Sequence, residues 1–144
     1  MNKFSKSTNE LLNEICETDE IDKFLEKNSN EFADFNLSEY IEESIKERGL
    51  QKSKVAARSG LNRIYAYQIF SGKRFPSRDK LIAIGFGLEL NIAEMDNLLR
   101  CSGFSTLYSR NKRDAMIIHA ISNKMSVFAL NELLFDNGID ILTS

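Results

Sequence analysis

The sequence predicts an all-α protein, and three observations support this prediction. The 144 residues include one proline and seven glycines, so few positions interrupt a helix. Apolar residues recur at spacings of three and four, which is the spacing of one helical face, whereas the alternation typical of strands is scarce. Serine and asparagine side chains, which cap the first turn of helices, precede most of these apolar runs. We therefore expect a helical core with helical extensions at both ends.

Residues 1–37 predict an acidic helical extension. Ser7 and Glu10 form a capping-box pattern, in which a hydroxyl and a carboxylate three residues later satisfy the first amides of a helix. Two short helices follow, each with its apolar residues on one face: Leu11, Leu12 and Ile15, then Ile21, Phe24 and Leu25. Such a face needs a surface to pack on. Residues 1–37 are therefore a candidate site for a protein partner.

Residues 38–103 predict five helices joined by very short turns. Four polar residues stand where helices are expected to begin: Ser38, Asn62, Ser77 and Asn91. Four glycines stand where helices are expected to end: Gly49, Gly60, Gly72 and Gly103. The residues expected to face the core are Val55, Ala56, Ala66, Ile69, Leu81, Ile84, Leu88, Met95, Leu98 and Leu99. This segment is predicted to form one domain.

Residues 104–144 predict two more helices, which either brace the core or form a dimer contact. Asn111 and Ser126 are the expected caps, and Gly138 is the expected end of the second helix. The residues expected to face inward are Ala115, Ile118 and Ile121, then Val127, Leu130, Leu133 and Leu134. Both helices therefore present an apolar face to the rest of the domain or to a second copy.

Charge is partitioned sharply along the chain. Residues 1–45 hold 4 basic and 12 acidic side chains, and residues 46–80 hold 10 basic and 2 acidic ones. The middle segment therefore carries a net charge of +8 in a chain whose total is −2. Such an asymmetry indicates a surface that faces a polyanion.

Several classes of protein are disfavoured. The longest apolar run, residues 81–88, is too short to span a membrane. The first ten residues lack the apolar core of a secretion signal, so we expect a cytoplasmic protein in which Cys16 and Cys101 stay reduced. No glycine-rich phosphate loop or paired Cys/His set is present. We expect Cys101 to be buried, His119 to be packed rather than catalytic, and the protein to be no enzyme and to need no cofactor.

One segment of the chain carries a family resemblance: KSKVAARSGLNRIYAYQIFSGKRFPSRDKLIAIGFGLELNIAEM. Ala56 is small where two helices are expected to cross, and Gly60 stands in the turn between them, where a positive φ is often required. Gly72 and Pro76 separate the third helix from the fourth. In this order and spacing, residues 38–100 resemble the helix-turn-helix domain of the lambda-repressor-like class, often called the XRE family. The resemblance implies a five-helix core.

The resemblance also implies a DNA-binding site. In this family the third helix, here about residues 62–71, lies in the major groove with its first residues at base edges. The implied base contacts are Asn62, Arg63, Ile64, Tyr67 and Gln68. The implied phosphate contacts, which supply affinity and register, are Lys52, Lys54, Lys73, Arg74 and Arg78. The expected protein is a sequence-specific transcription regulator that binds double-stranded DNA as a homodimer.

The third helix also departs from the family pattern. Phe70 replaces a common glutamate, Tyr65 and Tyr67 are bulkier than usual, and Ala66 is smaller. One explanation is compensation, in which an aromatic neighbour fills the volume that Ala66 leaves. The other is that the helix contacts protein, because aromatic residues are enriched at protein interfaces. A protein-interaction or adaptor module, in which the acidic N-terminal helices and the aromatic third helix bind a partner, is therefore the second hypothesis.

A third hypothesis combines the first two. The N-terminal residues would receive a signal from a partner or a modification, and this would change how the basic residues are exposed. Removal of residues 1–37 is then expected to raise DNA affinity, most clearly at low salt, where screening is weak.

Overall fold

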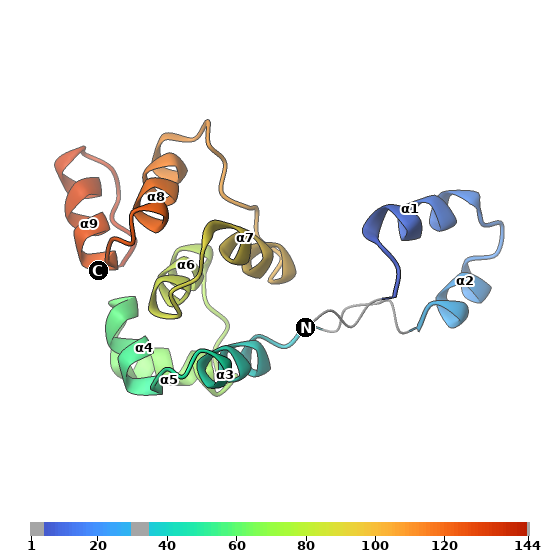
Figure 1. Cartoon of the computed structure of the whole chain (residues 1–144), viewed down its shortest axis with the longest axis horizontal. Helices are drawn as coiled ribbons and strands as arrows, with labels where there is room; N and C mark the ends of the chain where they lie inside the picture. The colour runs from blue at the N-terminus through green and yellow to red at the C-terminus, as the bar shows by residue number, and fades with distance from the viewer. Residues whose placement is uncertain (1–4, 30–34, 144) are drawn as a thin grey trace. The chain divides into compact units, whose positions relative to one another are not determined.

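The structure is a computed structural model that describes residues 5–29 and 35–143, and within these ranges it contains nine α-helices and no strand. The all-α prediction is therefore confirmed. The chain divides into two compact units, residues 1–35 and residues 36–144 (Figure 1). The helices are α1 Thr8–Glu17, α2 Ile21–Lys27, α3 Leu37–Glu47, α4 Lys52–Ser59, α5 Arg63–Phe70, α6 Arg78–Gly87, α7 Ile92–Cys101, α8 Lys112–Ser122 and α9 Val127–Asp136.

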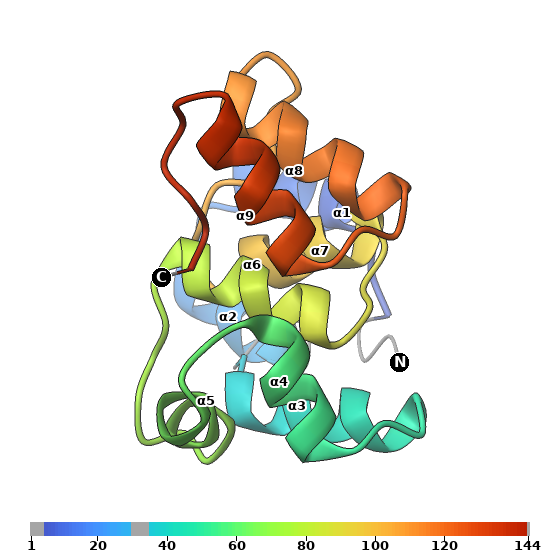
Figure 2. The same ribbon diagram turned by 90° about the vertical axis from the view of Figure 1, so that its left-hand side faces the viewer.

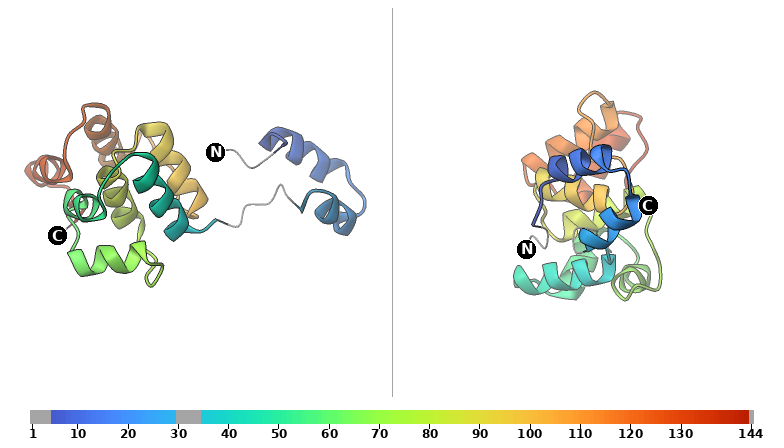
Figure 3. Two further views of the ribbon diagram at one scale, coloured as in Figure 1. Left: turned by 60° about the horizontal axis from the view of Figure 1, so that its bottom comes forward. Right: turned by 90° about the vertical axis from the view of Figure 1, so that its right-hand side faces the viewer.

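The first unit consists of α1 and α2, which contact each other (Figure 3). Ser7 caps α1 as expected, because its hydroxyl accepts a hydrogen bond from the Glu10 amide at 3.1 Å. No residue of α1 is buried, and Phe24 is the one buried residue of α2. Residues 1–4 and 30–34 of the expected extension lie outside the described residues. The described part of this unit therefore has well-formed helices and very little core.

The second unit contains α3 to α9 around one apolar core. The helices α3, α4 and α5 lie at one end, α8 and α9 at the other, and α6 and α7 between them (Figure 2). The largest fully buried side chains are Ile41, Ile69, Leu81, Ile82, Ile84, Leu88, Met95, Leu98, Leu99, Ile117, Leu130 and Leu134. The backbones of α4 and α6 approach closely, since a Cβ atom on Gly87 would lie 2.5 Å from the Val55 carbonyl oxygen.

Most of the expected helix starts in this unit are confirmed. The side chains that cap helices are those of Asn62, Ser77, Asn91, Asn111 and Ser126. The prediction for Ser38 is wrong, because Asn36 caps α3 two residues earlier by accepting from the Glu39 amide at 3.1 Å. The Ser38 hydroxyl instead donates to the Phe70 carbonyl oxygen at 2.6 Å, so it joins α3 to the end of α5.

The inward face of α8 differs from the expected one. Asp114, Ile117 and Ala120 are the buried residues of this helix, whereas the expected set of Ala115, Ile118 and Ile121 is half-buried. The face is turned by one residue because the Asp114 carboxylate is held between α8 and the start of α6 by hydrogen bonds from Arg78. The spacing of the apolar residues alone does not reveal that a carboxylate such as Asp114 is buried.

Two expectations for single residues in this unit are also wrong: His119 is not packed and Cys101 is not buried. His119 is exposed, and its ring nitrogen Nδ1 lies 3.2 Å from the side-chain Nδ2 of Asn123. Cys101 is exposed near the end of α7, and so is Cys16 in the first unit. Neither cysteine forms a disulfide.

No helix within the described ranges combines the length and the apolar content that a membrane crossing requires.

Candidate nucleic-acid interface

The first turn of α5 projects into solvent. Gly60 adopts the left-handed conformation with φ +71° and ends α4, so that the chain turns within three residues. The Asn62 side-chain oxygen then accepts hydrogen bonds from the Ile64 and Tyr65 amides at 3.0 and 3.2 Å. Asn62 and Arg63 are exposed, and the Ile64 side chain is 70% exposed. The turn and the cap together present these three side chains at the surface.

The opposite face of α5 belongs to the core. Ala66 is fully buried, and Phe70 is 4% exposed. The Tyr67 ring lies beside Phe70, with 5.9 Å between the ring centroids. Phe70, which replaces the glutamate common in the family pattern, is therefore a core residue. Gln68 and Tyr67 lie at the border between the two faces and are half-buried.

The two tyrosines of α5 each hold a pair of cations. Lys52 and Arg63 lie over the Tyr67 ring, at 5.7 and 5.4 Å from its centroid. Cations are attracted to the negative face of an aromatic ring, and this attraction restricts long side chains that otherwise move freely. Tyr67 thus holds Lys52 from α4 and Arg63 from α5 near its ring.

The second group lies around Tyr65. Arg74, from the loop after α5, lies 5.7 Å from the Tyr65 centroid, and Lys80, from the first turn of α6, lies 4.3 Å from it. Lys80 was not among the expected phosphate contacts. Its distance from Tyr65 along the sequence is too large for helical spacing to reveal the pair, so only the folded chain brings the two together.

The basic residues around α5 form no ion pair with a carboxylate in the part of the chain that the structure describes. Within residues 5–29 and 35–143, none of the following takes part in an ion pair: Lys52, Lys54, Arg63, Lys73, Arg74 and Lys80. Asp79, one of the two acidic residues in 46–80, is bound to Arg113. We call these six cations, together with Asn62, Ile64, Tyr65, Tyr67 and Gln68, the basic face. It combines uncompensated positive charge with an exposed helical turn.

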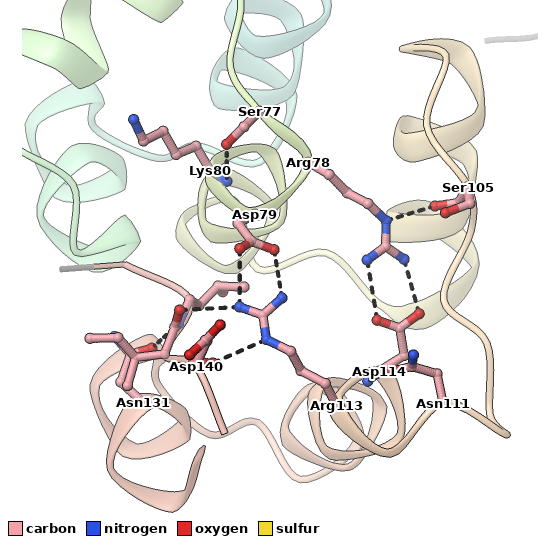
Figure 4. A network of polar contacts seen from close by, with 12 residues as sticks. Ser77, Arg78, Asp79, Lys80, Ser105, Asn111, Arg113, Asp114, Asn131 and Asp140 are labelled. Carbon is pink, nitrogen blue, oxygen red and sulfur yellow. Dashed lines mark hydrogen bonds and ion pairs between the residues drawn. The ribbon is translucent and has the colours of Figure 1, made fainter. Parts of the chain in front are cut away.

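Arg78 does not belong to the basic face. Its Nε donates to the Ser105 carbonyl oxygen at 3.0 Å, and its two terminal nitrogens donate to the Asp114 carboxylate at 3.2 and 3.0 Å (Figure 4). A further bond reaches the Thr106 carbonyl oxygen at 3.2 Å. Every guanidinium nitrogen is therefore used inside the protein, and the expected phosphate contact has to be removed from the site.

A second ion pair lies beside the first, and in it the arginine belongs to α8 and the aspartate to α6. Arg113 of α8 donates to both oxygens of Asp79 at 2.7 and 3.1 Å, and it also binds the carbonyl oxygens of Asp140 and Ile141 (Figure 4). The hydrogen bonds that Arg113 donates to Asp79 raise the pKa of Arg113, against the opposing effect of burial. The Arg-Asp sequence in the first turn of α6 is thus cross-paired with the Arg-Asp sequence in the first turn of α8.

These pairs join α8 and residues 140–141 to the first turn of α6. Val127 and Thr143 approach the turn before α5 as well, since a Cβ atom on Gly60 would lie 3.2 and 3.1 Å from their side chains. Residues 112–143 therefore contact the chain on both sides of α5.

Comparison with known proteins gives no further guide to function. No protein-family model, no curated protein and no solved structure matches this chain. The described residues also contain no group of three or more His, Cys, Asp or Glu side chains placed to hold a metal ion. The function of the basic face has to be inferred from its own geometry and charge.

Proposed function

We propose that this protein is a sequence-specific DNA-binding transcription regulator with a lambda-repressor-like core formed by α3 to α7. The observation that carries the proposal is the basic face, in which an exposed helical turn is bordered on two sides by cations that pair with no carboxylate of the described residues. Double-stranded DNA fits both the charge and the exposed turn, because its phosphates are negatively charged and its base edges are accessible in the grooves. In this proposal α5 enters the major groove of double-stranded DNA.

The base contacts are assigned to the Asn62 cap and to the exposed and half-buried residues of α5 that follow it. Arg63 is able to donate two hydrogen bonds to a guanine edge, and Gln68 pairs in a similar way with adenine. Asn62 uses its side-chain oxygen for the helix cap, so its amide group is left to act as a donor. Ile64 is available for contact with a thymine methyl group, and Tyr67 borders this set.

The phosphate contacts are assigned to the cations beside α5, namely Lys52, Lys54, Lys73, Arg74 and the newly found Lys80. Tyr65 and Tyr67 hold four cations of the basic face near their rings. A side chain that is already restricted loses less conformational entropy when it binds. The tyrosines that depart from the family pattern thus have a role in DNA binding as supports of the basic side chains. A homodimer would place two such faces on half-sites about one helical turn apart.

Selection from a random duplex library, followed by salt-titrated binding of the selected duplex and of a scrambled one, tests the proposal. We expect an enriched motif that is bound on the order of a thousandfold more tightly than the scramble. Arg63→Glu, Lys73→Glu and Arg74→Glu together are expected to weaken binding at least about a hundredfold.

The matched control for this triple variant keeps the total charge change equal. Arg100, Arg110 and Lys112 are exposed and lie in α7, in the segment after it and in α8. Their replacement by glutamate is expected to reduce affinity much less, because they lie outside the basic face. Equal losses in both triple variants, or no enriched motif, would show that only general charge attraction acts.

The first unit supports a second candidate function, that of a protein-interaction module. Its two helices leave large apolar side chains exposed: Leu12 at 55%, Ile15 at 45%, Ile21 at 51% and Leu25 at 44%. Capture of a protein partner that is lost in Leu12→Asp and Leu25→Asp would support this function. Capture that is unchanged in both variants would exclude it.

A further inference from the structure

A cavity in the second unit borders both the C-terminal helices and α4. Its volume is about 590 Å³, within the usual range for small-molecule sites. The apolar side chains that line it are Phe86, Leu90, Ile121, Met125, Val127 and Phe128, and its polar lining residues are Arg58, Glu89, Lys124 and Ser126. Phe128 is 59% exposed, so solvent reaches the cavity from its side.

Two helix ends of this unit that lack the usual glycine lie at the same cavity. Each of the seven helices α3 to α9 is followed by a residue with positive φ, and after five of them this residue is glycine: Gly49, Gly60, Gly72, Gly103 and Gly138. The other two are Glu89 after α6, with φ +61°, and Lys124 after α8, with φ +54°. A side chain in this conformation costs free energy that glycine avoids. Both of these residues line the cavity.

The two charged residues differ in what their side chains do. Glu89 accepts a hydrogen bond from Arg58 at 2.8 Å, so an ion pair within the protein accounts for it. Lys124 is exposed, and its ammonium group has no ion pair or hydrogen bond with any residue that the structure describes. The strained backbone at Lys124 therefore keeps a cation at the border of an apolar cavity without an internal partner.

The remaining polar groups also favour a negative ligand group. Arg58 balances Glu89, so Lys124 leaves the border of the cavity with net positive charge. The Ser126 oxygen accepts from the Ala129 amide at 3.1 Å, which leaves the hydroxyl hydrogen to be donated elsewhere. The first turn of α9 lies at Val127 and Phe128, and free amides at a helix start favour nearby negative charge.

We propose that this cavity binds a small carboxylic acid with an apolar chain or ring. The carboxylate lies at Lys124 and Ser126, and the apolar part lies against Phe86, Leu90, Ile121 and Met125. The site is separate from the basic face, so its occupancy does not depend on the proposed DNA binding. Val127 and Phe128 also lie within 3.2 and 3.5 Å of where a Cβ atom on Gly60 would be, so one cavity wall contacts the turn before α5.

Calorimetric titration with three probes of equal chain length tests the proposal: octanoate, octan-1-ol and octylammonium. We expect saturable binding of octanoate at one site, with octan-1-ol at least about tenfold weaker because it lacks the charged hydrogen bonds. Octylammonium is expected to be weaker still. Chemical shifts of the Met125 methyl group and of the Gly60 amide are expected to change with octanoate at the same concentration.

Two glycine variants provide matched tests, because glycine suits the backbone at both positions. Lys124→Gly is expected to lose the preference for octanoate over octan-1-ol without a decrease in thermal stability. Glu89→Gly removes the opposite charge from the same cavity border and is expected to keep or increase octanoate affinity. Lys124→Arg is expected to retain the preference. Equal affinity for octanoate and octan-1-ol in the unmodified protein, binding of octanoate without saturation, or unchanged octanoate binding in Lys124→Gly would overturn the proposal.

Discussion

The two units of this chain carry the same local helix signals but differ in how much apolar surface they bury. In the first unit Ser7 caps α1, and in the second Asn91 and Glu94 form a reciprocal capping box at α7. Yet α1 has no buried residue, whereas Met95, Leu98 and Leu99 of α7 are fully buried. Good caps and an apolar face therefore make a helix possible, but the number of helices that share the face decides its burial.

The difference has a thermodynamic consequence. Short helices are marginal in water, and most of their stability in proteins comes from the packing of an apolar face. The second unit collects apolar faces from seven helices into one core. The first unit has two helices and buries Phe24 as its one large apolar side chain among the described residues. We expect the two units to respond very differently to the loss of one apolar residue.

The largest expected effect is that of a truncated core side chain in the second unit. Leu98→Ala is expected to lower the free energy of unfolding by about 2–5 kcal/mol, because Leu98 is fully buried and leaves a cavity. Denaturant unfolding followed by tyrosine fluorescence measures this, since all four tyrosines lie in residues 36–144.

The matched change in the first unit sharpens the comparison. Leu12 is 55% exposed, so Leu12→Ala is expected to change the same transition by less than about 0.5 kcal/mol. A similar loss for Leu12→Ala and Leu98→Ala would contradict the view that Leu12 contributes little buried apolar surface.

The next effect concerns the paired Arg-Asp sequences of the second unit. The Asp114 side chain is 10% exposed and accepts from Arg78 and from the Tyr108 amide. Asp114→Ala leaves these donors without their acceptor, and is expected to cost about 2–3 kcal/mol of unfolding free energy. Asp79 is 41% exposed, so Asp79→Ala is expected to cost about 1 kcal/mol or less. Denaturant unfolding of the two variants checks the order, and a larger loss for Asp79→Ala would refute it.

The smallest effect is expected in the first unit on acidification. Hydrogen bonds from Lys6 and Asn28 lower the pKa of Glu14 below its ordinary value of 4.5. Because the folded form binds the proton less tightly than the unfolded form, this contribution to stability is full above pH 4.5 and is lost as the pH falls below it. Amide exchange of residues 8–28 is expected to increase in this range. Glu14→Gln is expected to remove the pH dependence, and its persistence in this variant would assign the effect to another group.

Much of the second unit could be predicted because its signals are local. Asn62, Ser77, Asn91, Asn111 and Ser126 cap helices as expected, since a cap requires only a suitable side chain and the next three residues. The failures have tertiary causes. Ser38 is drawn to the Phe70 carbonyl oxygen, and Asp114 turns the buried face of α8 toward Arg78. Neither partner lies near in sequence.

The candidate site could likewise be predicted only in part from the sequence. The exposure of Asn62, Arg63 and Ile64 follows from the turn at Gly60 and the helical period, both of which the sequence contains. The assignment of single cations does not follow from it. Arg78 and Lys80 are two residues apart on α6, yet Arg78 points to Asp114 and Lys80 lies over Tyr65. Only the side-chain contacts that folding creates, between Arg78 and α8 and between Lys80 and α5, separate their roles.

The sequence by itself determined the helical class, most of the helix starts, and the concentration of positive charge in residues 46–80, because each depends on residues close together in the chain. The tertiary structure decided which cations pair with a described carboxylate and which do not, which face of α8 is buried, and where Lys124 lies beside an apolar cavity. These properties depend on pairs of residues that are distant along the chain. Their free energies arise only when folding brings the partners together.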